Sequence, residues 1–513
     1  MIKSVQIRVD PEIAEKKHLL INKISNDFNI QKNTVSHIEI VKKSIDARQK
    51  KILINLKIDV YINEKFIPKK ILSNYQNVEN SREVLIIGAG PAGLFAALKL
   101  IENGIKPIII ERGKKVRNRR RDLAKLTKEH IVNPDSNYCF GEGGAGTFSD
   151  GKLYTRSKKR GDVDNILNIL VEHGATPQIK IDAHPHIGTN KLPKIIENIR
   201  ERIIEYGGEI LFNSRLVDIK IQNNRVSSVT LMDKTEINCS KIILATGHSA
   251  RDIFELLKNK GVFLEKKSFA LGIRVEHSQD LIDQIQYKCN SRGEYLPPAP
   301  YSISKQINGR GVYSFCMCPG GIIAPCATSQ NEVVTNGWSP SKRDYPSSNS
   351  GIVVELKNND FNEFYKHNVF AGLEFQKNIE KSAWEMAGKT QKVPAQRLVD
   401  FINGKTSIDI PKTSYLPGTV SSNLKDLFPK FIYKNLQQGF IEFGKQMKGY
   451  LTNEAIVHAP ESRTSSPVRI PRNPQTLEHI KIKGLYPCGE GAGYAGGIIS
   501  AAIDGQKCAE MCS

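Results

Sequence analysis

Short, uninterrupted apolar segments recur along the chain and alternate with helical patterns. The segments 83–87, 106–110 and 241–245 are continuous enough to be strands that are buried on both faces of a parallel sheet. Between the first two, residues 91–102 carry small and apolar residues at helical spacing and end at Asn103-Gly104, which is typical of a helix stop. This alternation predicts a doubly wound α/β domain with a parallel sheet.

The first 80 residues follow a different pattern. Residues 2–9, 36–45 and 51–62 alternate between apolar and polar positions, as half-buried strands do, and residues 12–30 carry apolar positions at helical spacing. Asp10 followed by Pro11 is typical of a helix start. We expect residues 1–80 to form a small β-α-β-β domain followed by a polar linker. It contains no catalytic constellation, so docking or stabilisation is its default role.

The rest of the chain divides into a mixed region and a return to the first pattern. Residues 251–444 combine strand-like stretches with a helical stretch around 361–386. The final residues again show a short strand, a glycine turn and a helix of small residues. We therefore expect one domain to be assembled from residues 81–250 and 445–513, with 251–444 inserted as a mixed α+β substrate or cap domain.

Composition narrows the class of protein. The chain has 513 residues, 39% of them hydrophobic and 25% charged, which is typical of a globular protein with two or three domains. No run approaches the ~18 apolar residues that a membrane helix needs. The start of the chain lacks the apolar core of a signal peptide, so a cytoplasmic location is predicted.

Nine cysteines and a formal net charge of +21 need separate interpretations. The cysteines are scattered and lack zinc-site spacing, so neither a disulfide framework nor a metal is expected. Cys316 and Cys318 lie on one predicted strand and would point to opposite faces, which favours buried thiols over a reactive pair. The charge suggests nucleic acid or an acidic partner, but no recognised nucleic-acid-binding module accompanies it, which favours an overall compositional bias toward lysine as the explanation.

A dinucleotide fingerprint follows the first buried strand directly. Gly88 permits a tight turn, Gly90 lets the backbone approach a pyrophosphate, and Gly93 lets helix and strand pack closely. Glu111 closes the next strand, where a carboxylate can accept both hydrogens of a ribose diol. The helix start offers unpaired N–H groups to phosphates. The predicted motif residues are Gly88, Gly90, Pro91, Ala92, Gly93 and Glu111.

A second glycine-rich helix start near the C-terminus indicates which dinucleotide the site binds. Glu490 follows Gly489 after a short strand, and Gly497 and Ile498 begin the last helix. This pairing resembles FAD-dependent oxidoreductases of the glutathione-reductase-like type. The resemblance implies that the late acid holds a ribityl hydroxyl of noncovalently bound FAD. The N–H groups near Gly497 and Ile498 would then face the flavin ring, where reduced flavin carries negative charge.

Further motifs indicate a particular group within these FAD-dependent oxidoreductases. The stretches GEGGAGTFSDGKL, PHIGTNKL, GHSARD, CMCPGG, ESRTSSPVRI and GEGAGYAGGIISAAIDG are similar to those of bacterial proteins called uncharacterised FAD-dependent dehydrogenases. The similarity spans most of residues 80–513. It implies that Val217 lies where the family's backbone contacts adenine. It also implies that Ala245, Thr246 and Gly247 belong to the strand that leads out to the substrate domain.

A glycine run at residues 139–153 lacks a preceding buried strand, so a second dinucleotide site is not expected there. We predict that it lines the same FAD site through Gly143, Gly144, Ala145 and Gly146, with Ser149 and Asp150 on the reactive side. Arg112 and Arg119, from the densest basic run, are candidates for neutralising the pyrophosphate. The alternative is that this run is a solvated face.

Four side chains are candidates for catalysis, each with a structural alternative. Asp150 is a possible base or orienting group, or else it caps a turn. Arg463 is a possible clamp for a substrate carboxylate, or else part of a structural salt bridge. Glu461 precedes it by two residues, and His248 follows the strand that leads to the inserted domain.

The resulting prediction is an FAD-dependent oxidoreductase that transfers hydride between flavin and an unidentified small molecule. Only one dinucleotide fingerprint is present, so NAD(P)H, if it is used, binds transiently. Two alternatives stay open: a flavin enzyme that acts on RNA, and a non-catalytic electron-relay protein that docks an acidic redox partner. The substrate and the oligomeric state are not predicted.

Overall fold

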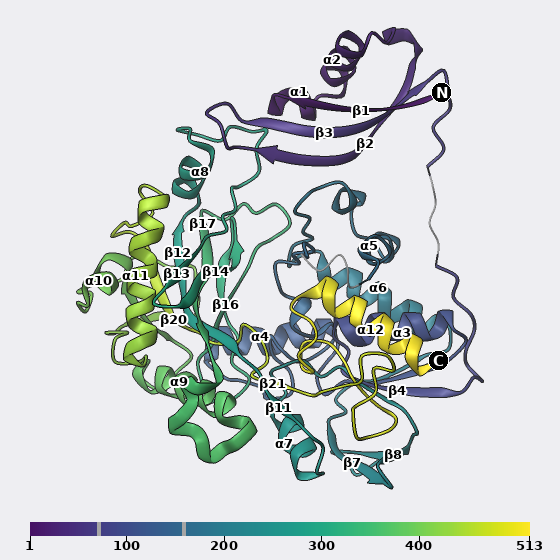
Figure 1. The fold of residues 1–513 in the computed structure, drawn as a ribbon, viewed down its shortest axis with the longest axis vertical. Helices are drawn as coiled ribbons and strands as arrows, with labels where there is room; N and C mark the ends of the chain where they lie inside the picture. Colours follow the sequence, from purple (N-terminus) through teal and green to yellow (C-terminus); the bar gives the residue numbers. More distant parts are fainter. Residues whose placement is uncertain (69–72, 156–160) are drawn as a thin grey trace.

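The computed structural model describes residues 1–68, 73–155 and 161–513. Figure 1 shows a small N-terminal unit above two larger parts, an α/β domain and a domain built on a large antiparallel sheet. The predicted α/β fold class, with its doubly wound parallel-sheet domain, is confirmed. No helix among the described residues is long and apolar enough to cross a membrane.

The N-terminal unit has the predicted β-α-β-β order. Its strands form a three-stranded antiparallel sheet in the order β1-β3-β2. Alternate residues of β1 and β3 are buried together with Leu20 and Ile24 of the second helix, which explains the period-2 pattern in the sequence. The elements are β1 (Ile2–Val9), α1 (Pro11–Glu15), α2 (Lys17–Phe28), β2 (Val35–Asp46) and β3 (Leu53–Ile62). Residues 69–72 of the predicted linker lie outside the described residues.

The α/β domain is built on a five-stranded parallel sheet in the order β22-β10-β4-β5-β6. Val84 and Ile86 of β4 pack into one core, and Leu85 and Ile87 into another on the opposite face, which explains its continuous apolar run. The strands are β4 (Glu83–Ile87), β5 (Lys106–Ile110), β6 (Glu209–Leu211), β10 (Ile242–Leu244) and β22 (Leu485–Pro487).

Helices cover one face of this sheet, and a small antiparallel sheet with one helix covers the other. The first face carries α3 (Pro91–Glu102), α5 (Val163–Glu172), α6 (Leu192–Glu205) and α12 (Ile498–Cys512). The second carries β7 (Leu216–Gln222), β8 (Arg225–Leu231), β9 (Glu236–Asn238) and α7 (Arg251–Asn259). The basic run forms α4 (Val116–Glu129). Because β22 pairs with β10, the C-terminal segment lies beside the first glycine motif.

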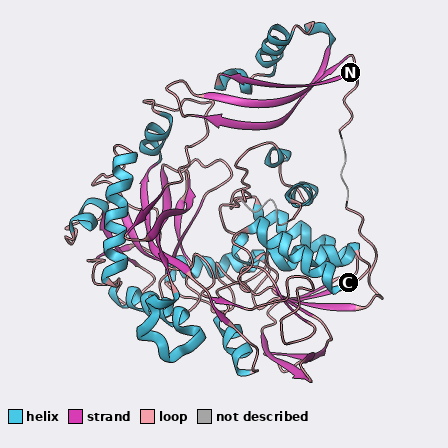
Figure 2. Ribbon diagram, viewed as in Figure 1, coloured by secondary structure: helices cyan, strands magenta, loops and turns pink. Residues whose placement is uncertain are grey.

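The inserted domain contains a seven-stranded sheet in the order β13-β14-β17-β12-β20-β18-β19, flanked on its outer side by helices (Figure 2). Its pairs are antiparallel except β18 with β19. Its strands are β12 (Phe269–Ser278), β13 (Ser304–Ile307), β14 (Arg310–Cys318), β17 (Ser347–Leu356), β18 (Val393–Arg397), β19 (Thr419–Ser421) and β20 (Ile456–Glu461), and a separate ribbon pairs β15 (Ile322–Pro325) with β16 (Thr335–Trp338). Its helices are α8 (Gln279–Tyr287), α9 (Ala371–Met386), α10 (Leu398–Asn403) and α11 (Lys430–Gln446).

The structure corrects both predicted boundaries of the inserted domain. Helix α7, placed in that domain by the prediction, packs Ile253 and Leu257 into the core of the α/β domain. Strand β20, placed in the α/β domain, lies in the seven-stranded sheet beside β12. The chain passes between the domains where β11 (Glu265–Lys266) pairs with β21 (Val468–Arg469).

The helical stretch predicted around 361–386 is also revised. Residues Asn358–Phe370 form tight 3-10 turns that are interrupted at Phe361 and Asn368, and the α-helix begins only at Ala371. Aromatic packing of Phe361 against Phe269 and Phe375 holds the irregular segment, and the apolar spacing alone does not reveal it.

Candidate functional site

A cavity of about 330 Å³ lies between the α/β domain and the seven-stranded sheet. On one side it is lined by the segments that follow the carboxyl ends of β4, β5, β10 and β22. On the other side it is lined by residues of β14, β16 and β20. A crevice at the carboxyl edge of a parallel sheet, at the point where strand order reverses, is where α/β domains bind ligands.

Glycines from distant segments form one wall of the cavity. The second glycine run lies directly on the first: a Cβ built on Gly144 would come within 3.0 Å of the Gly90 Cα. Gly143 supports this contact by donating its N–H to the Ala89 carbonyl at 2.8 Å. The start of α3, whose first residue is Pro91, has no capping side chain in the part of the chain that the structure describes. The run at 139–153 is therefore part of the same site, and the first turn of α3 lies at that site.

Three further glycines face open space. A Cβ on Gly247, Gly496 or Gly497 would meet no heavy atom of the described residues within 4 Å, although all three line the cavity. Gly497 is the residue before α12 and has a φ of 123°. The backbone at these positions can therefore be approached closely by a bound molecule.

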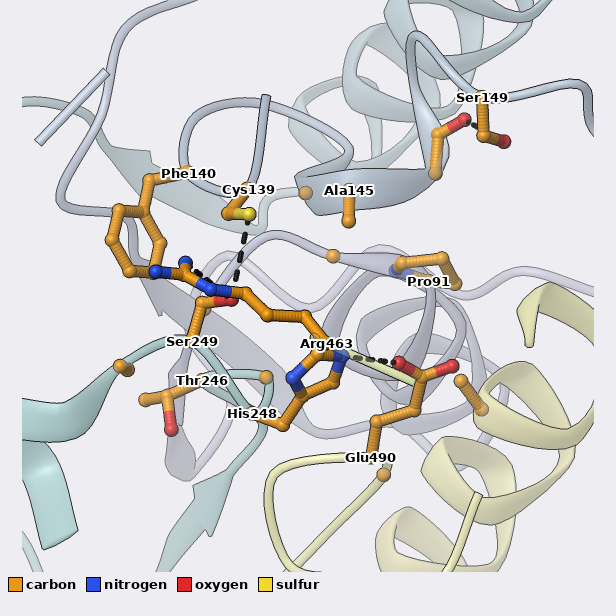
Figure 3. A pocket seen from close by; sticks show the side chains of 18 of the residues that line it. Pro91, Cys139, Phe140, Ala145, Ser149, Thr246, His248, Ser249, Arg463 and Glu490 are labelled. Atoms are coloured by element: carbon orange, nitrogen blue, oxygen red, sulfur yellow. Dashed lines mark hydrogen bonds and ion pairs between the residues drawn. The ribbon is translucent and has the colours of Figure 1, made fainter. Parts of the chain in front are cut away.

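Glu490 and His248 face each other beside the start of α12 (Figure 3). A Glu490 carboxylate oxygen accepts a hydrogen bond from the Gly497 N–H, and the other lies 3.6 Å from His248 Nε2. Burial lowers the pKa of His248, against the opposing effect of Glu490, so the imidazole is uncharged at neutral pH. The negative group thus lies where a helix start favours negative charge.

Glu111 lies at the junction of three backbone segments. Its carboxylate accepts hydrogen bonds from the N–H groups of Ala89 at 2.8 Å and of Gly113 and Gly141 at 2.9 Å. The side chain is 4% exposed and lines the cavity. It therefore ties both glycine loops to the end of β5, a role that the fingerprint alone did not indicate.

The two predicted arginines differ in their placement. Arg112 lines the cavity, lies over the Phe140 ring and pairs with Asp135 and Asp252 at 2.8 and 3.0 Å. Arg119 is fully buried and donates to the carbonyls of Asn137, Tyr138 and Glu142. Its guanidinium holds the glycine loop from behind and does not line the cavity, which corrects the prediction for this residue.

Three other predicted residues also lie outside the lining. Gly93 and Gly143 act through packing, since a Cβ on Gly93 would lie 1.9 Å from the Gly88 oxygen. Val217 is 37% exposed, and its neighbour Leu216 lines the cavity instead. The other predicted cofactor residues line it: Gly88, Gly90, Pro91, Ala92, Glu111, Arg112, Gly144, Ala145, Gly146, Ala245, Thr246, Gly247, Gly489, Glu490, Gly497 and Ile498.

Glu461 lines the opposite wall but is committed to an ion pair. Arg274, which is fully buried, donates Nε and Nη2 to its two oxygens at 2.7 and 2.9 Å. Asn349 accepts a further hydrogen bond from Arg274 at 2.7 Å. Both oxygens of this carboxylate are therefore held by Arg274, which favours a structural ion pair over a catalytic role for Glu461.

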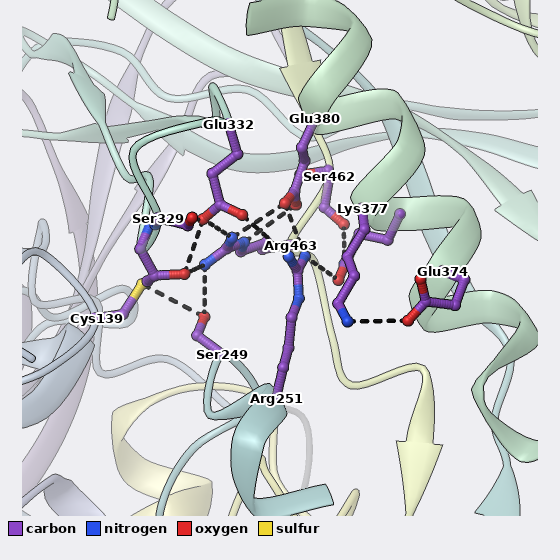
Figure 4. A network of polar contacts seen from close by, with 12 residues as sticks. Cys139, Ser249, Arg251, Ser329, Glu332, Glu374, Lys377, Glu380, Ser462 and Arg463 are labelled. Carbon is purple, nitrogen blue, oxygen red and sulfur yellow. Dashed lines mark hydrogen bonds and ion pairs between the residues drawn. The ribbon is translucent and has the colours of Figure 1, made fainter. Parts of the chain in front are cut away.

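Arg463 belongs to a buried network of two arginines and two glutamates (Figure 4). Its Nη2 contacts Glu332 at 2.5 Å and Glu380 at 3.0 Å, and Arg251 pairs with the same two acids at 3.1 and 2.7 Å. Its Nη1 donates to Ser249 and Thr328. This geometry favours the structural salt bridge over the predicted carboxylate clamp.

Asp150 is the catalytic candidate in which only one of the two carboxylate oxygens has a hydrogen bond within the described residues. Its Oδ2 accepts a hydrogen bond from Arg343 at 3.2 Å and lies 3.9 Å from Lys152 Nζ, whereas its buried Oδ1 has no hydrogen-bond partner among the residues that the structure describes. Burial alone would raise the pKa of Asp150, but Lys152 and Arg343 hold it below its usual range. Lys152 also lines the cavity and was not predicted, although it follows Asp150 by only two residues.

One group of three potential metal ligands occurs among the described residues: Cys488, Asp504 and Cys508. Arg472 already donates to both oxygens of Asp504, at 2.5 and 3.0 Å, and to Cys508. A guanidinium in this position supplies the positive charge that a bound cation would otherwise supply.

Comparisons with known domain families match three parts of the chain. Residues 81–130 match an FAD binding domain, and residues 268–464 match the C-terminal-domain-like part of FAD-dependent proteins. Residues 1–61 match a domain of unknown function. The second match agrees with the domain boundaries in the structure.

Similar proteins include one described as uncharacterized from Clostridium beijerinckii, which is 39% identical over 99% of this chain and 97% of its own length. A thiamine thiazole synthase of Aeropyrum pernix is 25% identical over 43% of this chain and 75% of its own length. Among solved structures, CtdE in complex with FAD has 12% identity and a TM-score of 0.33, covering 84% of each chain. Glycine oxidase from Bacillus cereus has 14% identity and a TM-score of 0.31, covering 84% of this chain and 94% of that one.

Proposed function

The chain belongs to a family of FAD-dependent proteins, and we propose that it is an oxidoreductase that passes a hydride between bound FAD and a small molecule held against the seven-stranded sheet. The observation that carries the proposal is the convergence of three glycine segments at one sheet edge, opposite a wall of polar side chains. One wall suits a cofactor backbone, and the other suits recognition of a substrate.

The residues on the first wall fit FAD. The uncapped start of α3 and the close pair Gly90 and Gly144 would hold the pyrophosphate, and Glu111 would lie at the adenosine ribose. The open glycines Gly496 and Gly497 would lie against the flavin ring. When bound, the flavin supplies the hydride chemistry.

The chain's own groups would position charge and protons around that chemistry. The N-terminus of α12 favours negative charge near Gly497, and Glu490 with the neutral His248 can share a proton beside it. Asp150 lines the cavity and its lowered pKa keeps it ionised, so its carboxylate can accept a hydrogen bond from a substrate donor. Asp150 is therefore the group that we assign to substrate orientation.

The FAD assignment is tested by equilibrium titration of the flavin-free protein with FAD, using Glu111→Ala and a control, Glu83→Ala. Glu83 lies on β4 of the same sheet and is exposed. We expect the dissociation constant of Glu111→Ala to rise about tenfold or more, because three backbone donors lose their acceptor and the two glycine loops loosen. Equal affinities in the two variants would reject this edge as the FAD site.

The oxidoreductase assignment is tested on the FAD-loaded protein under anaerobic conditions. Organic hydride donors, including NADH and NADPH, are added one class at a time, and loss of the flavin absorbance is followed. At least one donor class is expected to bleach the flavin, and Asp150→Asn should slow bleaching by that donor. A protein that binds FAD but is bleached by none of them would contradict the proposal.

A further inference from the structure

Strand β14 places a thiol on the cavity wall at a distorted point of the strand. Phe315 pairs with Gly351 and Cys318 pairs with Asn349, so β14 has one more residue than β17 between these pairs. This is a β-bulge, and Cys316 within it has a φ of 48°. Its side chain is exposed and lines the cavity. A left-handed conformation favours glycine, so a cysteine here is held against a local preference.

The sequence prediction placed Cys316 and Cys318 on opposite faces of one strand because side chains alternate along a regular strand. The bulge interrupts that alternation. The side chain of Cys318 turns back toward residue 316, because its Sγ lies 3.3 Å from the Cys316 carbonyl oxygen. Both cysteines thus lie within one bulge of β14, where Cys316 lines the cavity and Cys318 is buried, so the strict alternation of a flat strand does not apply to them.

Two charged side chains lie beside this bulge. Lys152 donates to the Cys318 Sγ at 3.5 Å and lies 3.9 Å from Asp150, which is only 4% exposed, and both charged residues line the cavity. An ammonium beside a sulfur stabilises the thiolate form. Burial raises the pKa of Cys318 to about 11, and Lys152 acts against that rise. Cys318 therefore stays protonated at rest, and the exposed Cys316 is the thiol that an external molecule reaches.

We propose that Cys316 and Cys318 form a dithiol–disulfide pair that exchanges two electrons with the flavin and delivers them to an external disulfide. The inference rests on the proposed function, because the organic hydride donor supplies the electrons. It identifies the acceptor as a molecule that contains an S–S bond.

The sulfur chemistry balances as follows. The Cys316 sulfur attacks the external disulfide, which forms a bond to one external sulfur and releases the other as a thiol. Cys318 displaces the second external thiol and leaves the Cys316–Cys318 disulfide. Two electrons and one proton from the reduced flavin, with one proton from solvent, then restore both thiols. A hydride from the organic donor returns two electrons and a proton to the flavin.

The test is an anaerobic reductive titration of the oxidised, FAD-loaded protein with dithionite. Wild type is expected to take up about twice the electrons that its flavin alone accepts, since a disulfide is a second two-electron centre. Cys316→Gly and Cys318→Ser are expected to take up only the flavin's share. Glycine suits the conformation at 316, so this variant keeps the fold. Cys326→Ser removes another thiol of the cavity and should behave as wild type.

A second measurement does not depend on the flavin. After equilibration with oxidised glutathione, the wild-type peptide that contains both cysteines is expected to be lighter by two hydrogens in its mass spectrum. A peptide that keeps two free thiols would overturn the inference, as would wild-type electron uptake in Cys316→Gly or loss of uptake in Cys326→Ser. If the protein took up no FAD, the proposed function would fail, and this peptide measurement would still decide whether the thiol pair exists.

Discussion

Glu332 and Glu380 lie between the guanidinium groups of Arg463 and Arg251, and all four side chains are buried or nearly so. At the residue scale this network is what joins α7 of the α/β domain to α9 of the inserted domain. Burial alone would raise the pKa of Glu332, but the two arginines outweigh it and lower the pKa to about 2. Removing one member of such a network leaves a buried charge unpaired.

The depressed pKa of Glu332 predicts a contribution to acid stability. A carboxyl group with a folded pKa below its unfolded value stabilises the fold above the unfolded value, and this contribution is lost as the pH falls toward the folded value. Between about pH 5 and pH 2, Glu332 should account for a loss of about 3 kcal/mol of unfolding free energy. Urea unfolding at several pH values should show that Glu332→Gln, although less stable at pH 7, lacks this part of the slope.

The exposed Glu255 on α7 provides the control for that measurement. Its pair with Lys377 is at the surface, so Glu255→Gln should keep the wild-type slope. A Glu332→Gln variant with the wild-type slope would show that the arginines do not hold the carboxyl group as described.

The sequence revealed some of these residues and not others for a physical reason. Glu111 was found because a short, contiguous motif fixes its distance from the glycines. Glu332 and Glu380 lie 131 and 83 residues from Arg463, so no local spacing connects them. Arg463 was therefore given two interpretations, and only the packed structure distinguishes them. Lys152 escaped notice for the same reason, since its partner Cys318 is 166 residues away.

At the scale of elements, α3 and α12 form the closest helix pair of the α/β domain, because small residues let their backbones approach. A Cβ on Gly505 of α12 would lie 2.0 Å from the Ala92 carbonyl oxygen of α3. This contact holds the C-terminal glycine motif against the first one. The helical patterns predicted both elements, whereas the contact between them and the placement of β20 depend on pairing across hundreds of residues.

Gly505→Ala tests this contact. Alanine favours an isolated helix by about 1 kcal/mol, yet here the overlap with backbone should dominate and lower the free energy of unfolding by about 2–3 kcal/mol. Gly496→Ala, where a Cβ would lie within 4 Å of no heavy atom in the described part of the chain, should change the free energy of unfolding by less than about 0.5 kcal/mol. Denaturant unfolding of the flavin-free proteins measures both. Equal stability of the two variants would contradict the close packing of α3 and α12.

At the scale of the whole molecule, backbone hydrogen bonds join the N-terminal unit to the segment 181–187, and other backbone contacts join that segment to residues 152 and 153 at the cavity. Lys43, on the edge of β2, donates to the Ile181 carbonyl at 2.9 Å and accepts from the Ala183 N–H at 3.0 Å. A few residues later, Leu153 donates to the Pro185 carbonyl, and His186 forms a bridge to Lys152. The N-terminal unit therefore holds the segment 181–187 that supports Lys152. The sequence predicted the unit's fold but not this contact, since edge pairing leaves no signal in the apolar pattern.

Replacing Lys43 by proline tests whether these contacts support the cavity wall. The Lys43 N–H points to Ile181, so proline removes that one bond from the edge of β2. Exchange of the backbone amide hydrogens in 181–187 should become about tenfold faster or more. The reason is that a backbone hydrogen bond worth about 1 kcal/mol or more is lost and the pairing of this segment with β2 is disturbed. Lys43→Ala keeps the N–H, so its amide hydrogens in 181–187 should exchange as in wild type. The FAD affinity of both variants should be unchanged, since neither residue 43 nor residue 181 lines the cavity. Unaltered exchange in the proline variant would mean that the segment is held by the α/β domain alone and that the N-terminal unit has no part in shaping the site.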